Sequence, residues 1–159
     1  VMMDAEVHLT DLWSSDSNKA FSSYVSAMRR GESEASKAGL DLIACIPYYY
    51  DGKVLEESLS NLVSDGCDAL AVMNYLKNNE AEHLYEEALL CEKYSKPLIN
   101  IYELQPPGVH GLMEKNTYYN DGLAVLNERW GILKENFPDN IFSYALHDYD
   151  SLKEVMVNE

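Results

Sequence analysis

The chain has 159 residues and a mass of 18.0 kDa, with 47% hydrophobic and 25% charged residues. This length and composition are typical of one ordinary globular domain and exclude an intrinsically disordered chain. Twelve basic and 27 acidic residues give a formal net charge of −15. Such a surface repels phosphate backbones and anionic lipids, so nucleic acids and membrane surfaces are poor partners, while neutral and cationic ligands remain open.

The first half of the sequence alternates short β-rich runs with helical stretches. Residues 7–12 alternate apolar and polar side chains and predict a first strand. Residues 18–38 repeat apolar side chains at three- and four-residue steps, which predicts a helix, and Gly39 follows where a left-handed helix cap belongs. Residues 40–46 are almost continuously apolar and predict a buried second strand, and residues 54–63 predict a second helix.

The second half continues this alternation. Residues 68–73 predict a third strand, residues 81–89 carry the apolar stripe of a third helix, and residues 98–102 predict a fourth strand. Residues 103–117 then predict a loop, and a loop of that length inside a compact domain is usually functional or a linker. A fourth helix, a fifth strand and a short final helix are expected over residues 121–134, 141–146 and 148–157.

Strictly alternating strands and helices with apolar strands are typical of an α/β protein. We therefore expect an open parallel sheet of about five strands with helices on both faces. Right-handed crossovers place the carboxyl ends of all strands along one edge, and ligands of such sheets bind at that edge.

The common catalytic and cofactor motifs are absent from the sequence. No GxGxxG, GxxxxGK[ST] or GxSxG motif occurs, and the four histidines do not have the spacing of metal ligands on one helix. Cys45, Cys67 and Cys91 lie in apolar segments and are expected in the core. We therefore expect no catalytic residues, no metal site and no cofactor.

Aromatic and short polar side chains gather just after the predicted strands. Aromatic rings stack on the C–H faces of sugars, and Asp, Asn, Ser and Glu pair with sugar hydroxyls, so this edge predicts a site for a small polar solute. The candidate ligand-binding residues are Trp13, Ser15, Asp16, Asn18, Phe21, Tyr48, Asn74, Tyr102 and Glu103.

Three stretches resemble the amino-terminal lobe of type I periplasmic sugar-binding proteins and lactose-repressor-type ligand-binding domains. They are Gly31 with residues 34–42 (EASKAGLDL), residues 59–72 (LSNLVSDGCDALAV) and residues 80–101, which end in KPLINI. The resemblance covers about residues 7–102 and implies a lobe of flavodoxin-like topology that binds a solute, a sugar in the first place, in uptake or regulation. It also implies an extracellular or periplasmic location and a membrane transporter or regulatory protein as partner.

The sequence departs from this family at the end of the fourth predicted strand and in the tail. Tyr102 and Glu103 stand where that family commonly has an Asp-Arg pair that binds sugar hydroxyls. We divide the chain into a ligand-binding lobe, 1–105, and a tail, 106–159, that either completes the same sheet or belongs to a truncated second lobe. The tail either folds back as a fifth strand-helix unit, which we favour, or pairs two chains as a homodimer. The alternative function is a flavodoxin-like single-domain enzyme or nucleotide binder that uses the same edge.

Overall fold

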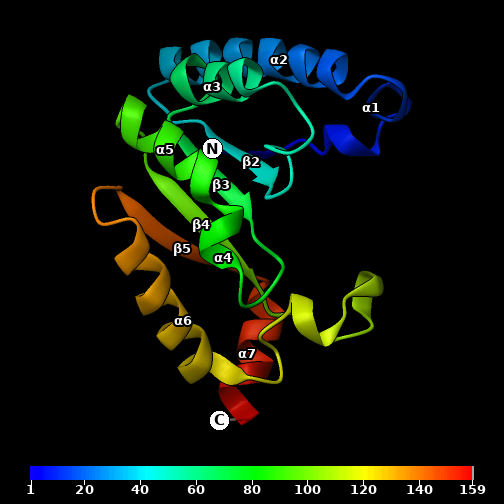
Figure 1. Cartoon of the computed structure of the whole chain (residues 1–159), viewed down its shortest axis with the longest axis vertical. Coiled ribbons are helices and arrows are strands. Elements are labelled where there is room, and N and C mark those ends of the chain that lie inside the picture. The colour runs from blue at the N-terminus through cyan, green and yellow to red at the C-terminus, as the bar shows by residue number, and fades with distance from the viewer. Residues whose placement is uncertain (159) are drawn as a thin grey trace.

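Five parallel strands form one open sheet with helices packed against it in the computed structural model (Figure 1), which describes residues 1–158. The predicted fold class, an α/β protein with an open parallel sheet of about five strands, is confirmed. The elements in chain order are β1 (Met2–Asp4), η1 (Val7–Leu9), α1 (Asp11–Ser15), α2 (Ser17–Lys37), β2 (Ile43–Pro47), α3 (Glu56–Asp65), β3 (Ala69–Met73), α4 (Glu80–His83), α5 (Tyr85–Tyr94), β4 (Leu98–Glu103), η2 (Val109–Gly111), η3 (Glu114–Asn116), α6 (Gly122–Asn136), β5 (Phe142–His147) and α7 (Tyr149–Asn158).

The strands lie side by side in the order in which they occur along the chain, β1-β2-β3-β4-β5. Right-handed crossovers between successive neighbours place every connecting helix on the same side of the sheet. The contacts agree, because α2 packs on α3, α3 on α5 and α4 on α6 (Figure 1). Helices are expected on both faces of the sheet, but here they lie on one face. Helices on both faces require a reversal in strand order, and this sheet has none.

The main core lies between the helices and the face of the sheet that they cover. Side chains alternate along a strand, so every second residue of each strand points into this core. The strand residues in it include Ala44, Ile46, Leu70, Val72, Leu98 and Tyr102. They pack against Phe21 and Met28 of α2, Leu59 and Leu62 of α3, Ala88 and Cys91 of α5, and Leu126 and Leu133 of α6.

The opposite face of the sheet carries a small second cluster. Cys45, Ala71 and Ile101 are its buried members, and Ile99 and Ala145 are half-buried beside them. None of the crossover helices contributes to this cluster within residues 1–158. We call this side the uncovered face.

The first strand is displaced from its predicted position. The prediction of a strand over residues 7–12 is wrong, because η1 and α1 occupy this segment. The Thr10 hydroxyl accepts a hydrogen bond from the backbone N–H of Trp13 at 3.2 Å and so caps α1. The first strand is instead β1, three exposed residues that pair with β2 at the edge of the sheet.

The helix predictions agree more closely with the structure. The Asp16 side chain accepts a hydrogen bond from the N–H of Lys19 at 3.0 Å and caps α2, and Gly39 has a φ of 70° after its end. The third predicted helix is split at Leu84 into α4 and α5. The tail completes the same sheet, since β5 pairs in parallel with β4.

Cys45, Cys67 and Cys91 are buried and free, as expected for core cysteines. Within residues 1–158, no helix combines the length and the apolar character needed to cross a bilayer.

Candidate functional site

A groove lies on the uncovered face at the carboxyl end of the sheet. Cys45 of β2, Met73 of β3, Ile101 of β4 and Ala145 of β5 alternate to this face and form an apolar floor. The groove has a volume of about 560 Å³. Ligands of open α/β sheets bind outside the carboxyl ends of the strands, and this volume lies within the usual range of small-molecule sites.

One end of the groove holds a paired carboxylate and imidazole. Glu103 ends β4 and His147 ends β5, and the two residues are partners in the sheet register. The Nδ1 atom of His147 lies 3.0 Å from Oε2 of Glu103, and the backbone N–H of Gln105 donates to Oε1 at 2.7 Å. Only 3% of Glu103 is exposed. These partners hold the carboxylate in one orientation at the wall of the groove.

The other side of the groove is formed by the amino-terminal segment. Asp4 is the register partner of Cys45, so it points to the uncovered face, and Glu6 follows it on the rim. No Lys or Arg is among the described residues that line the groove. Three carboxylates, of Asp4, Glu6 and Glu103, therefore border an apolar floor.

The ionisable groups at the floor stay neutral. Burial and then the Asp4 carboxylate raise the pKa of the Cys45 thiol to about 12. Burial and then Glu103 raise the pKa of Tyr75 far above that of a free phenol. The groove thus offers a protonated thiol and a protonated phenol, and Cys45 is not an activated nucleophile.

A second hollow of about 310 Å³ continues the groove along the edge of the sheet. It shares Glu6, Met73 and Tyr75 with the groove and adds the aromatic rings of Tyr48 and Tyr49. Aromatic rings thus lie next to the acidic rim. This combination suits a ligand that has both an apolar face and polar groups.

The segment after β4 forms part of the rim of both hollows. Its His110 and Leu112 line both of them. The Asn116 side chain holds this segment in place by donating to the carbonyl of Tyr75 at 2.7 Å and accepting from the N–H of Met113 at 3.0 Å. The long loop expected over residues 103–117 therefore borders the groove.

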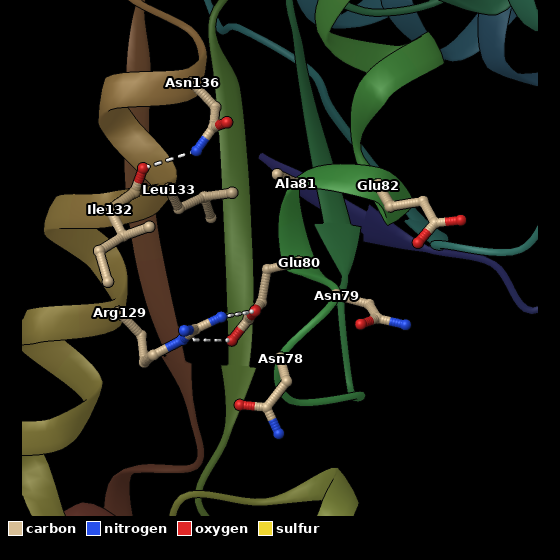
Figure 2. Close-up of a pocket in the computed structure, with 9 residues that line it drawn as sticks. All are labelled: Asn78, Asn79, Glu80, Ala81, Glu82, Arg129, Ile132, Leu133 and Asn136. Carbon is tan, nitrogen blue, oxygen red and sulfur yellow. Dashed lines mark hydrogen bonds and ion pairs between the residues drawn. The ribbon is translucent and has the colours of Figure 1, made fainter.

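Another hollow, of about 250 Å³, lies between α4 and α6 (Figure 2). Its charged centre is an ion pair in which Nη2 of Arg129 donates to Oε2 of Glu80 at 2.7 Å, and the hydroxyl of Tyr118 also donates to Glu80. Although burial raises the pKa of Glu80, hydrogen bonds from Arg129 and Tyr118 bring it below its usual value. The two charges satisfy each other, so this cluster joins α4 to α6.

Two of the predicted site residues lie in these hollows. Glu103 lines the groove, and Tyr48 lines the second hollow that continues it. Phe21 and Tyr102 are fully buried in the main core. Asn74 is 2% exposed and donates to Oδ1 of Asn100 at 3.0 Å and to the carbonyl of Glu80. These three side chains lie on the helix side of the sheet, away from the groove.

The four candidates near the amino terminus build the start of the helical layer. The Trp13 ring packs on Tyr50, with ring centroids 4.8 Å apart. The Ser15 hydroxyl donates within α1, and Asp16 caps α2. Oδ1 of Asn18 accepts from the backbone N–H of Leu55 at 2.9 Å. None of these four is among the described residues that line the groove.

Sequence reasoning missed most of the groove. Asp4 and Glu6 lie outside the predicted site because the sequence predicts the first strand at residues 7–12, after both of them. His147 lies outside it because acidic residues such as Asp148 and Asp150 are also typical of a helix start. The two-residue period of a strand does predict Tyr75. It lies two residues after Met73, on the same side of the strand as the groove floor.

Comparisons with protein-family models, with curated proteins and with solved structures find no match. Within residues 1–158, no group of three or more His, Cys, Asp or Glu side chains is arranged to hold a metal ion. The fold and the groove therefore define the class of this protein: an open parallel α/β sheet with a small-molecule-sized groove on its uncovered face.

Proposed function

We propose that the protein binds a small polar solute in the groove and serves solute uptake or ligand sensing without catalytic chemistry. The observation that carries this proposal is an apolar floor bordered by oriented hydrogen-bonding groups at the carboxyl ends of the strands. A sugar fits this description, because its C–H face packs on apolar or aromatic groups while its hydroxyls donate to carboxylates.

The sequence resemblance to type I periplasmic sugar-binding proteins supports the same class of ligand. In that family the ligand lies between two lobes, whereas here the groove has a floor and rims on one sheet. A single wall buries less of a ligand, so we expect weaker binding than a closed cleft gives. A transporter or regulatory partner remains part of this proposal.

The nucleotide-binding alternative receives less support from the groove. A phosphate needs backbone N–H groups, Lys or Arg, and the groove instead presents the carboxylates of Asp4, Glu6 and Glu103. The high pKa of Cys45 also removes the thiol as a nucleophile.

Calorimetric titration with a panel of monosaccharides, amino sugars and polyols tests the proposal. The informative variant is Ala145→Trp, which places a large ring on the groove floor. Its matched control is Ser143→Trp, which adds the same ring to the same face of β5 at a position outside the groove lining.

We expect Ala145→Trp to weaken binding at least about tenfold and Ser143→Trp to leave it unchanged, since only the former occupies the ligand volume. Circular dichroism confirms that both variants fold. The proposal fails if no member of the panel binds the unmodified protein, or if Ala145→Trp binds as well as Ser143→Trp does.

A further inference from the structure

The charged residues around the groove indicate which charge the solute carries. The rim has three carboxylates, of Asp4, Glu6 and Glu103, and no Lys or Arg among the described lining residues. The basic groups that contact two of these carboxylates are imidazoles: Nε2 of His8 lies 3.8 Å from Glu6, and Nδ1 of His147 lies 3.0 Å from Glu103.

Two carboxylates elsewhere in the fold have guanidinium partners. Arg29 pairs with Asp65 at 2.9 Å, and Arg129 pairs with Glu80 at 2.7 Å. Within residues 1–158, Asp4, Glu6 and Glu103 form no ion pair with Lys or Arg. Negative charge that borders an apolar, partly enclosed floor gains from a cation supplied by the ligand, because a low-dielectric wall strengthens the attraction.

The neighbouring groups respond to the same negative field. After burial, the carboxylates of Glu103, Asp4 and Glu6 all raise the pKa of Tyr75, and those of Asp4 and Glu6 raise the pKa of Cys45. The rings of Tyr75, Tyr48 and Tyr49 add aromatic faces that attract a cation within about 6 Å of the ring centre.

We infer that the solute carries a protonated amine, whose charge lies at the rim between the amino-terminal carboxylates and Glu103 while its body rests on the apolar floor. This inference rests on the proposed solute-binding function and names the chemical class of its ligand. An amino sugar and a short aliphatic diamine both have this chemistry.

Two matched pairs of probes isolate the charge. D-glucosamine and D-glucose share a sugar ring, and putrescine and 1,4-butanediol share a four-carbon chain; in each pair the first is cationic at pH 6. Calorimetric titrations in about 20 mM and about 300 mM salt measure the affinity of each. We expect the cationic member to bind about tenfold tighter at low salt, with a smaller preference at high salt because the rim is partly exposed.

The variants locate the effect in the groove. Asp4→Asn/Glu6→Gln removes two rim charges and is expected to lower the affinity for the cationic probes about tenfold while changing that for the neutral probes less than about twofold. The control, Glu92→Gln/Glu135→Gln, removes two exposed charges from α5 and α6 and is expected to change neither.

The outcomes separate this inference from the proposed function. Equal binding of the cationic and neutral members overturns the cation inference and leaves solute binding standing. A preference that falls equally in both double variants also overturns it, because the net charge of −15 then attracts cations without a site. If no neutral or cationic probe binds, the proposed function fails together with the inference.

Discussion

The two faces of the sheet are built from the same strands and have different surroundings. Ile46 and Leu98, on the covered face, are fully buried beneath the helices, whereas Ile99 and Ala145, on the uncovered face, are only half-buried. The adjacent residues Leu98 and Ile99 of β4 thus lie in the packed core and on the uncovered face, respectively. The strand order, rather than the residue itself, decides which environment a side chain has, because successive neighbours place all crossover helices on one side.

The same contrast applies to buried carboxyl groups. Glu87 of α5 is fully buried in the helical layer, and within residues 1–158 neither of its carboxylate oxygens has a hydrogen-bond partner. Burial raises its pKa to about 8. Glu103, beside the groove, accepts one hydrogen bond from the backbone N–H of Gln105 and contacts His147. Burial without a partner therefore favours the neutral form of Glu87 in the helical layer, whereas Glu103 has polar partners at the groove.

The largest expected effect comes from truncating one isoleucine on each face. Ile46→Ala leaves a cavity in the main core and should lower the free energy of unfolding by about 4 kcal/mol. Ile99→Ala removes the same atoms from a half-buried position and should cost about 1 kcal/mol. Urea denaturation measures both. Equal losses in the free energy of unfolding would contradict the description of this face as uncovered. They would require Ile99 to be buried by other groups in solution.

Next in size is the pH dependence that Glu87 imposes. Its carboxyl pKa is 4.5 in the unfolded chain and about 8 in the folded protein, so the folded state holds more protons between these values. Its contribution to stability is therefore fully present below pH 4.5 and is lost as the pH rises through 8. Glu87→Gln, which does not titrate, should be more stable than the unmodified protein by on the order of 3 kcal/mol at pH 7, and this gain should vanish at pH 4.5.

Thermal and urea unfolding at pH 4.5, 6 and 7 measure the gain. Glu86→Gln is the control, because the neighbouring Glu86 is exposed on the same helix. A gain at Glu87 that is constant over this pH range would show that its carboxyl group has a partner or solvent in the folded state.

The smallest effect concerns Asp16, a ligand-binding candidate that the structure places at the start of α2. Asp16→Ala removes the acceptor for the N–H of Lys19 and should cost about 1 kcal/mol, while Asp16→Ser should retain most of the stability because Ser also caps helices. Solute affinity should be unchanged in both. A variant of Asp16 that loses solute affinity but keeps its stability would show that the solute binds at the segment after α1.

The sequence predicts most of the helices and the central strands because their patterns are strong and local. Residues 18–38 predict α2 almost to the residue, and the apolar runs predict β2, β3 and β4. The edge strand β1 is not predicted, because three exposed residues carry no hydrophobic periodicity. Residues 7–12 mislead because their alternation also fits a helix capped by Thr10.

The candidate site is predicted less well, since it depends on information that no single segment contains. The position of Glu103 at a strand end can be read locally, but the face to which it points is set by the order of all five strands. Trp13, Asp16 and Asn18 are expected at a strand end only because the sequence predicts a strand over residues 7–12, where the structure has η1 and α1. Asn74 and Tyr102 do lie near strand ends, yet both point into the main core.

Chemical-shift mapping on the ¹⁵N-labelled protein tests most directly the central claim that the uncovered face binds the solute. Titration with D-glucosamine and with D-glucose should shift the amides of Tyr75, Ile101, Glu103 and Ala145 in a saturable way and leave the helices of the covered face unchanged. Shifts confined to residues 13–21, or spread over the helical layer with no change in the groove, would contradict the claim.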